Sequence, residues 1–507
     1  MNTAVSTPPE STDRPAVRPA RERACGAGNG SPVEGPWQNF IDGTPRPPST
    51  GDYTPLIDPC TGRAAGSAAR SGERDVDAAC RAAERAFTTW RTTTPAERQR
   101  GLLALAALLE QESDRFTAAE CASTGKPYAS TARDEVAVAV DVLRYFAGAA
   151  RSHGGPTAGE YLEGHTSYVR REPLGVCAQM VPFNYPLLMA VWKVAPALAT
   201  GNTCVLKPSH NTPVTTLMLA EAASRVLPPG VVNVVCGDRL AVSTLLEHPV
   251  PRQVSATAST PSGIGIAQSA LQDVKRLHLG LGGKSPVLVL RDADVDAAAA
   301  AIADAGFFNA GQDCTAASRV LVAEPVRERF TAALVAQAAS RRTGPPSDPA
   351  VFYGPLGGEK QLQRILTHLE HLPSHTEIAT GGDRPHPRGW FLSPTVLVGV
   401  RAGDPLTTEE LFGPVITVES YDDLDEAVTR VNSSPYGLAC SVHGRDHATV
   451  MRTAAALDYG CVWVNTHLPL VSEMPHGGFK HSGMGKDLSV LAMDDLTRIK
   501  HVMHRIG

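Results

Sequence analysis

Residues 174–237 decide the fold class, because short apolar runs alternate there with a longer apolar segment. The runs GVCAQMVP (175–182), TCVLKP (203–208) and VVNVVCG (231–237) are typical of buried strands. The segment LLMAVWKVAPALA (187–199) is long and apolar enough for a buried helix. Strands that alternate with helices predict a parallel, doubly wound α/β sheet.

The segment RQVSATASTPSGIGIAQSA (252–270) repeats this pattern and predicts a strand, a tight turn and a helix. Ser259 and Thr260 suit the cap of that helix, and Pro261 suits its first position. Free backbone N–H groups and the positive end of the helix dipole can bind a phosphate at such a turn. No GxGxxG fingerprint strengthens this interpretation.

The flanks of this region are also α/β in character. Apolar residues recur at helical spacing over 76–112 and again over 134–151, so the early part of the chain is expected to be helical. Farther on, PVLVL (286–290), a helical pattern over 294–308 and RVLVA (319–323) predict a second α/β domain.

Composition excludes several classes of protein. A net charge of -5 over 507 residues and the absence of dense Lys/Arg runs argue against a nucleic-acid partner. No apolar stretch is long and uninterrupted enough to suggest a membrane span. Residues 1–36 are rich in Pro, Ser, Arg, Glu and Gly and contain no apolar core of a secretory signal. We therefore predict a disordered N-terminal arm and a cytoplasmic protein.

The ten cysteines are scattered, with no CxxC pair and no Cys/His cluster at zinc spacing. This pattern disfavours a disulfide framework and predicts no metal site. A single cysteine is most often a small buried apolar side chain. Only its neighbours can single one out as reactive.

Five motifs carry a specific likeness to a known family. They are PFNYP (182–186), LKPS (206–209), LGGKSP (281–286), FFNAGQDC (307–314) and EELFGPV (409–415). In this order and spacing they resemble the aldehyde dehydrogenase superfamily, and the likeness extends from about Trp37 to the chain end. The segments GEYLEGH (159–165) and GCVWVNTHLPLVSEMPHGGFKHSGMGKDLS (460–489) are most similar to the branch that oxidises 4-aminobutyraldehyde and betaine aldehyde.

The resemblance implies a Rossmann-like nucleotide-binding domain, an α/β catalytic domain and a small β oligomerisation flap, in a homodimer or homotetramer. The implied boundaries are 37–158 and 173–283 for the nucleotide-binding domain, 284–484 for the catalytic domain, and 159–172 with 485–507 for the flap.

The resemblance also implies a reaction. A cysteine thiolate adds to an aldehyde, the thiohemiacetal gives up hydride to NAD or NADP, and a thioester remains. Cys314 matches the family nucleophile, and Asn184 matches the donor to the oxyanion, together with the backbone N–H of Cys314.

Most residues matched to cofactor-binding positions lie in these motifs; Ser259 lies in the turn of the segment 252–270, and His210 directly follows LKPS. Lys207 would meet the adenosine ribose, Ser259 the pyrophosphate, and Glu410 and Phe412 the nicotinamide ribose and ring. Pro182 and Phe183 complete the expected cofactor contacts. His210 is a further candidate.

The chain departs from the family pattern at the general base. The expected ELGGK is Gly280-Leu281-Gly282-Gly283-Lys284, so the glutamate that activates the thiol and the hydrolytic water is a glycine. General acid–base catalysis contributes about 10²–10⁴ in rate, so hydrolysis of the thioester is expected to be slow. Glu473 and Lys193 match residues near a proton path in some aminoaldehyde-type relatives and are candidates to compensate.

Two further departures concern the cofactor. His210 replaces a glutamate that would accept from ribose hydroxyls and repel a 2′-phosphate, so NADP becomes admissible beside NAD. Ala258 replaces a glycine in the pyrophosphate turn, where its Cβ would hinder close approach of the phosphates.

Three functions follow from these residues. The leading one is NAD(P)-dependent oxidation of a small aldehyde, such as an amine-bearing one, with hydrolysis of the thioester. The second keeps the oxidation but passes the acyl group to CoA or to an amine. The third is a non-redox relative that has lost dehydrogenase activity.

Overall fold

A computed structural model describes residues 31–154 and 158–506, and the described chain from Ser31 onward forms one compact unit. Residues 1–30 of the predicted N-terminal arm lie outside the described residues. The last residues of the predicted arm, 31–36, are ordered. Val33 is buried, and the Glu34 carbonyl accepts a hydrogen bond from the Ser67 amide at 3.2 Å. In the two described ranges, no helix is both long and apolar enough to cross a bilayer.

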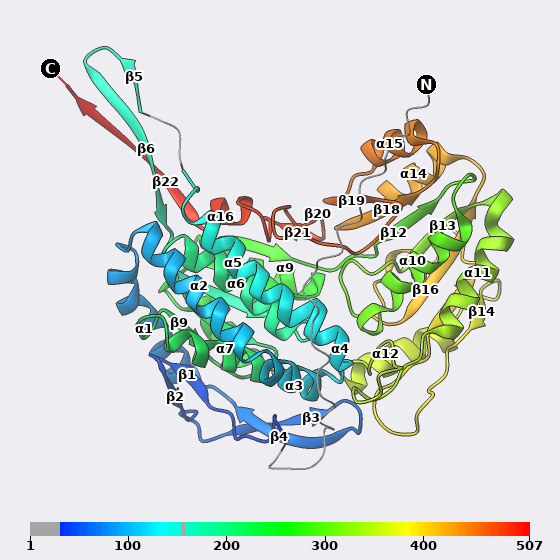
Figure 1. Cartoon of the computed structure of the whole chain (residues 1–507), viewed down its shortest axis with the longest axis horizontal. Helices are drawn as coiled ribbons and strands as arrows, with labels where there is room; N and C mark the ends of the chain where they lie inside the picture. The colour runs from blue at the N-terminus through cyan, green and yellow to red at the C-terminus, as the bar shows by residue number, and fades with distance from the viewer. Residues whose placement is uncertain (1–30, 155–157, 507) are drawn as a thin grey trace, which may run out of the picture. The chain divides into compact units, whose positions relative to one another are not determined.

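An eight-stranded sheet forms the first half of the unit, in the order β2-β1-β9-β8-β7-β10-β11-β21 (Figure 1). Its five central strands are parallel, as the sequence predicted, and β1 and β21 add antiparallel edges. The strands are β1 (Asn39–Ile41), β2 (Thr44–Arg46), β7 (Val176–Val181), β8 (Thr203–Pro208), β9 (Val232–Val234), β10 (Pro251–Thr257), β11 (Arg276–Gly280) and β21 (Gly483–Met484).

Helices cover both faces of this sheet, so its strands are apolar on both sides. One apolar core packs α2, α3, α5, α6 and α7 on one face, and a second core packs α1, α8 and α9 on the other. The helices are α1 (Glu73–Trp90), α2 (Pro95–Gln111), α3 (Ser113–Thr124), α4 (Tyr128–Thr131), η1 (Ala132–Val136), α5 (Ala137–Ala149), α6 (Pro186–Ala199), α7 (Val214–Ser224), α8 (Arg239–Glu247) and α9 (Thr260–Leu271).

The helical pattern predicted over 76–112 is two helices rather than one. The chain leaves α1 after Trp90 and restarts at Pro95, where the Thr94 side chain accepts a hydrogen bond from the Glu97 amide and the Glu97 carboxylate accepts one from the Thr94 amide. This capping box satisfies N–H groups at the new helix start and fixes the break.

A seven-stranded sheet forms the second half, in the order β14-β15-β16-β13-β12-β18-β19, with only β14 antiparallel to its neighbour. Its strands are β12 (Pro286–Val289), β13 (Arg319–Ala323), β14 (Glu377–Thr380), β15 (Thr395–Val398), β16 (Val415–Tyr421), β18 (Ala439–His443) and β19 (Cys461–Val464). Its helices are α10 (Val295–Phe307), η2 (Phe308–Gly311), η3 (Glu324–Val326), α11 (Arg327–Ser340), α12 (Glu359–Glu370), α13 (Pro405–Thr408), α14 (Leu424–Asn432) and α15 (His447–Ala456).

Three small sheets complete the described chain. Figure 1 shows β5, β6 and β22 as an arm that extends away from the eight-stranded sheet, and β6 pairs with β22 over nine residue pairs. The elements are β3 (Tyr53–Asp58) with β4 (Arg63–Ala69), β17 (Tyr436–Gly437) with β20 (Phe479–Lys480), and β5 (Gly159–Leu162), β6 (His165–Pro173) and β22 (Thr497–Arg505), preceded by α16 (Leu491–Asp495). The domain boundaries inside this unit remain predictions.

The two large sheets place the site. Ligands of open parallel sheets bind beyond the carboxyl ends of the strands. Here β7, β10 and β11 end at Val181, Thr257 and Gly280, and the loops that follow them face residues carried by the second sheet.

A buried ion pair joins two neighbouring strands of the second sheet, and we expect it to contribute to the stability of the fold. Nε of Arg319 on β13 lies 2.5 Å from Oε1 of Glu419 on β16, and Arg430 contacts the other oxygen at 3.0 Å. Replacing Glu419 with Gln leaves the buried Arg319 charge without its partner, which costs about 3–5 kcal/mol. We expect a large drop in the midpoint of urea unfolding, followed by tryptophan fluorescence.

Glu426→Gln is the matched control, because Glu426 pairs with Arg430 at the surface with its side chain 57% exposed. It is expected to change stability by less than about 0.5 kcal/mol. Equal losses in the two variants would contradict the importance of the buried pair.

Candidate active site

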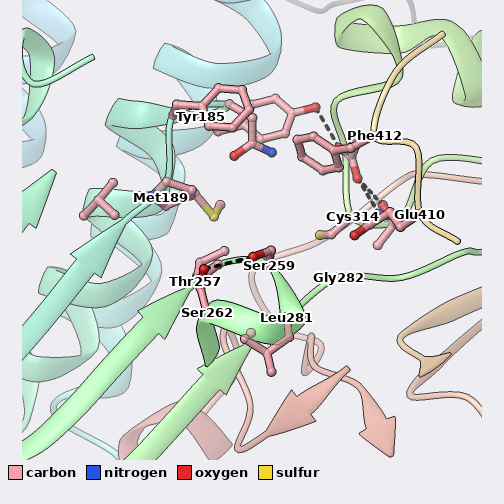
Figure 2. A pocket seen from close by; sticks show the side chains of 18 of the residues that line it. Tyr185, Met189, Thr257, Ser259, Ser262, Leu281, Gly282, Cys314, Glu410 and Phe412 are labelled. Atoms are coloured by element: carbon pink, nitrogen blue, oxygen red, sulfur yellow. Dashed lines mark hydrogen bonds between the residues drawn. The ribbon is translucent and has the colours of Figure 1, made fainter. Parts of the chain in front are cut away.

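One cavity of about 1470 Å³ lies where the two large sheets face each other. It is lined by loops from both sheets, and Figure 2 shows the sulfur of Cys314 pointing into it. The lining brings together most of the predicted site residues. These are Pro182, Phe183, Asn184, Lys207, His210, Ser259, Gly280, Cys314, Glu410 and Phe412.

The loop before Cys314 is held in an unusual backbone conformation. Asn309, Ala310 and Gly311 all have positive φ, of 50°, 58° and 65°. A Cβ on Gly311 would lie 2.1 Å from the Gly413 carbonyl oxygen, so only glycine allows this approach. The left-handed stretch therefore turns the chain sharply between α10 and the cysteine and fixes where Cys314 enters the cavity.

Asn184 sits beside this loop and is bound to it. Its Nδ2 donates to the Gln312 carbonyl at 3.0 Å, and Asn309 donates to the Asn184 carbonyl at 3.2 Å. The side chain is 8% exposed and lines the same cavity as Cys314. An amide nitrogen carries two hydrogens, so one remains available to a ligand oxygen near the sulfur.

Cys314 is not a ready-made thiolate in this protein. Burial raises the pKa of its thiol well above the ordinary value, and the negative charges of Asp313 and Glu410 raise it further. Asp313 is itself bound, because its carboxylate accepts from the Tyr185 hydroxyl at 2.7 Å and from the Thr315 amide at 2.7 Å. The sequence predicted a reactive cysteine, and the structure adds that its proton must be removed against these charges.

Glu410 and Phe412 form the opposite side of the cavity. Oε1 of Glu410 accepts from the Gly283 amide at 3.0 Å, and a Cβ on Gly282 would lie 2.1 Å from Oε2, so glycine allows the carboxylate to lie against the backbone. Phe412 packs edge-on against Phe183, with ring centroids 5.9 Å apart. A carboxylate beside a flat aromatic wall suits a ribose and an adjoining ring.

The first turn of α9 suits a pyrophosphate. Ser259 precedes the helix, and its hydroxyl donates to the Ser262 hydroxyl at 3.0 Å rather than capping a backbone amide. Amide groups of the first turn are therefore not capped by this side chain and can meet an anion. The helix begins at Thr260, so Pro261 is its second residue rather than its first.

The far end of the cavity is cationic. Lys207, His210 and Arg239 line it with Ser209. Burial lowers the pKa of Lys207, and burial together with the neighbouring Lys207 charge lowers the pKa of His210. These groups offer donors and positive charge to a phosphorylated ribose.

The two predicted compensating residues do not share this lining. Glu473 is exposed on the loop before His476, and the structure does not bring its carboxylate to Cys314, so the expectation that it acts there is not supported. Lys193 is buried behind the cavity wall, and its Nζ donates to the Ser255 hydroxyl at 3.1 Å.

Several cavity residues were missed by sequence reasoning. Asp313, His467 and Arg239 line the cavity, and the sequence motifs did not single out any of them. Asp313 precedes the nucleophile in its motif, which was an available signal. Nε2 of His467 donates to the Thr315 carbonyl at 2.6 Å, and its Nδ1 accepts from the Ser441 hydroxyl at 2.8 Å; no local pattern indicated this.

Comparisons with known proteins agree with this geometry. The model of the aldehyde dehydrogenase family matches residues 47–502. An aldehyde dehydrogenase from Aspergillus niger is 38% identical over 484 residues, covering 94% of this chain and 97% of that protein.

Solved structures give the same result. A putative aldehyde dehydrogenase from Burkholderia cenocepacia has a TM-score of 0.91 at 35% identity, covering 93% of this chain and 98% of that one. A betaine aldehyde dehydrogenase from Staphylococcus aureus in complex with NAD⁺ has a TM-score of 0.90 at 31% identity, covering 93% and 95%.

The fold and its relatives define an oxidoreductase of the aldehyde dehydrogenase type. The chain belongs to the aldehyde dehydrogenase family. Its cofactor is NAD or NADP, consistent with the NAD⁺ complexes of its structural relatives.

We expect cofactor affinity to depend on pH through the buried Glu410 carboxylate. Burial raises its pKa to about 7. A carboxylate accepts hydrogen bonds from two hydroxyls only when it is ionised, so bound cofactor favours the charged form and binding releases a proton. Cofactor affinity should therefore increase as pH rises through about 7, measured by fluorescence titration.

Glu410→Gln should lose this pH dependence and bind the cofactor about ten-fold more weakly at high pH, the loss expected for a hydrogen bond to a charged group. Glu359→Gln, at the exposed start of α12, is the control and should bind as the wild type does. An unchanged pH dependence in Glu410→Gln would contradict this role.

Proposed function

We propose that the protein oxidises a small aldehyde with NAD or NADP through a covalent intermediate on Cys314. The observation that carries the proposal is that one cavity holds Cys314, Asn184 and Glu410 together. Cys314 adds to the carbonyl carbon, while the Asn184 amide and the Cys314 backbone N–H stabilise the oxygen that becomes negative. The bound dinucleotide supplies the hydride acceptor. Collapse of the adduct then leaves a thioester on Cys314.

The pocket residues support the cofactor part of this proposal. Glu410 and Phe412 would orient the nicotinamide end, Ser259 the pyrophosphate, and Lys207 the adenosine ribose. Pro182 and Phe183 adjoin the same cavity wall. The guanidinium of Arg239, with His210 as a neighbouring hydrogen-bonding group, favours NADP among the two cofactors, because a 2′-phosphate would meet a cation and no carboxylate of the lining at that end.

An amine-bearing aldehyde is the substrate class we favour. Trp192 and Tyr185 give the cavity aromatic faces, and the carboxylate of Asp134 also belongs to its lining. Aromatic faces and a carboxylate suit a cationic amine at the far end of an aldehyde. The NAD⁺-bound structural relative named as a betaine aldehyde dehydrogenase agrees with this class.

Hydrolysis of the thioester is the slow step of this proposed reaction. Gly280 supplies no carboxylate where the family places its general base, so acylation should outrun deacylation. Gly280 leaves this wall without a side chain, and a Cβ there would meet only ordinary contacts with Thr257 and Asp487, at 3.5 and 3.6 Å. Transfer of the acyl group to CoA or to an amine is therefore the second candidate.

We also propose that the protein is a homodimer or homotetramer assembled through the arm formed by β5, β6 and β22. The arm exposes large apolar side chains, which monomeric proteins normally bury or cover with a partner. They are Tyr161, Leu162, Tyr168, Ile499 and Met503, of which Tyr161 is 80% exposed.

Stopped-flow formation of NADH and NADPH, with 4-aminobutyraldehyde and with a simple aliphatic aldehyde, tests the proposed function. We expect a burst of one reduced cofactor per site, then a slow steady rate, and an acyl adduct on Cys314 in the intact-protein mass. Relief of the slow phase by CoA or an added amine would assign the acyl acceptor. No reduced cofactor with either aldehyde, despite tight dinucleotide binding, would overturn oxidation and favour the non-redox function.

Gly280→Glu should convert the burst into faster steady turnover, by about 10²–10⁴ if the full effect of a general base is regained. The backbone accepts the change, because the added Cβ meets only ordinary contacts. Gly280→Gln is the matched control, since it adds the same bulk without a base and should leave the steady rate low. Equal rates in the two variants would show that deacylation is not limited by a missing carboxylate.

A further inference from the structure

A group of buried polar side chains lies directly behind Gly280. A Cβ built on Gly280 would lie 3.6 Å from Oδ2 of Asp487 and 3.5 Å from Oγ1 of Thr257. Asp487 is 7% exposed, so its carboxylate is almost fully removed from bulk solvent. A side chain at position 280 would therefore point toward the Asp487 carboxylate, which comes from a distant part of the chain.

The backbone fixes Asp487 at this place. Strand β21 pairs with β11 so that Gly483 stands opposite Gly280. Four residues later, the Asp487 amide donates to the His476 carbonyl at 2.7 Å, and the His476 amide donates back to the Asp487 carbonyl at 2.8 Å. These pairings hold the loop of Asp487 against the end of β11.

His278 faces Asp487 from β11. Because side chains alternate along a strand, His278 lies on the same side of the sheet as position 280. Its Nε2 lies 3.7 Å from Oδ1 of Asp487, and its Nδ1 lies 2.8 Å from the Ser255 hydroxyl. Ser255 in turn accepts from Nζ of Lys193 at 3.1 Å.

These contacts determine which ring nitrogen of His278 carries the proton. With its oxygen accepting from Lys193, the Ser255 hydroxyl can donate its hydrogen to Nδ1 of His278. The ring proton then resides on Nε2, which points at Asp487. Burial lowers the pKa of His278, although the Asp487 charge opposes this shift, so the ring is neutral.

Two polar atoms at the same wall lack partners. Oγ1 of Thr257 and Nδ1 of His476 have no hydrogen-bond partner among the residues that the structure describes. Both residues line the cavity together with Gly280, and His476 is only 6% exposed. Buried polar atoms of this kind are normally satisfied by water.

We propose that Asp487 accepts the proton of the water that hydrolyses the Cys314 thioester, with Thr257 and His476 holding that water at Gly280. This rests on the proposed function, because it requires a thioester on Cys314. The water is reached by Asp487 only because Gly280 has no side chain. His278 is a positioning residue that orients the Asp487 carboxylate, and Lys193 acts one step farther away through Ser255.

The step balances without any further reagent. One O–H bond of the water breaks and its proton moves to Oδ2 of Asp487, while the oxygen forms a bond to the thioester carbon. The C–S bond then breaks, the carboxylic acid leaves, and the proton passes from Asp487 to the Cys314 thiolate. Neither the water nor the thioester is oxidised or reduced in this step. The slow hydrolysis that follows the burst therefore needs no reagent beyond water and this carboxylate.

Asp487→Asn tests the proposal in single-turnover experiments with 4-aminobutyraldehyde. The burst of reduced cofactor should stay at its wild-type amplitude, whereas decay of the acyl adduct on Cys314 should slow on the order of 10²-fold. The double variant Asp487→Asn with Gly280→Glu should recover hydrolysis, because the added glutamate makes Asp487 dispensable. Decay at the wild-type rate in Asp487→Asn would overturn the proposal.

Glu473→Gln is the matched control, since this carboxylate lies on the same loop region but is exposed and away from the cavity lining. Its adduct should decay as in the wild type. A wild-type protein without any burst would refute the proposed function instead, and so the two failures are distinguishable.

Two further variants test the proposal independently in case Asp487→Asn does not fold. Thr257→Val keeps the shape of the side chain and should slow adduct decay without changing cofactor affinity; unchanged decay would contradict the water site. His278→Gln should change the pH profile of decay, because it removes the imidazole whose Nε2 lies 3.7 Å from Oδ1 of Asp487. A purely structural role would lower the rate equally at every pH.

The groups that face Asp487 and His278 in this pH experiment come from several elements. They are Lys193 on α6, His476 on the adjoining loop, Cys314 across the cavity wall, and Asp495 on α16. Burial lowers the pKa of both Lys193 and His476.

Discussion

The proton on Cys314 is the constraint around which the site is arranged. A thiol must lose this proton before it can attack, yet burial and the carboxylates of Asp313 and Glu410 hold its pKa high. A cysteine in such surroundings reacts slowly at neutral pH until a cation or a base enters the cavity. The oxidised nicotinamide ring is a cation, so binding of the cofactor and activation of the nucleophile are linked by simple electrostatics.

The fold delivers the groups that meet this constraint. Parallel strands place the ends of β7, β10 and β11 at one edge, where their loops supply Asn184, the first turn of α9 and the Gly280 wall. The second sheet supplies the strained loop of Cys314 and the Glu410 carboxylate. Position 280, at the end of β11, lies on a different element from Cys314, Asn184 and Glu410.

Much of this was predictable from local sequence. Strand and helix alternation predicted the doubly wound sheet, and the motif residues Cys314, Asn184 and Glu410 do share one cavity. The break between α1 and α2 also had a local signal, the Thr94 capping box. Asp487 had none, because it lies about two hundred residues from Gly280 and reaches it only through the β11–β21 pairing. Glu473, the acidic candidate from the sequence, is exposed and lies outside the cavity lining, because sequence nearness to a motif does not fix which way a loop carboxylate faces.

The rate at which iodoacetamide alkylates Cys314 as a function of pH, followed by peptide mass in the protein without cofactor, tests the central claim most directly. The account predicts slow alkylation at neutral pH and a rate that keeps rising into the alkaline range, because burial and the nearby carboxylates hold the thiol proton. Addition of NAD⁺ or NADP⁺ should move this rise to lower pH. A rate that is already at its plateau at neutral pH in the cofactor-free protein would show a preformed thiolate and contradict the account.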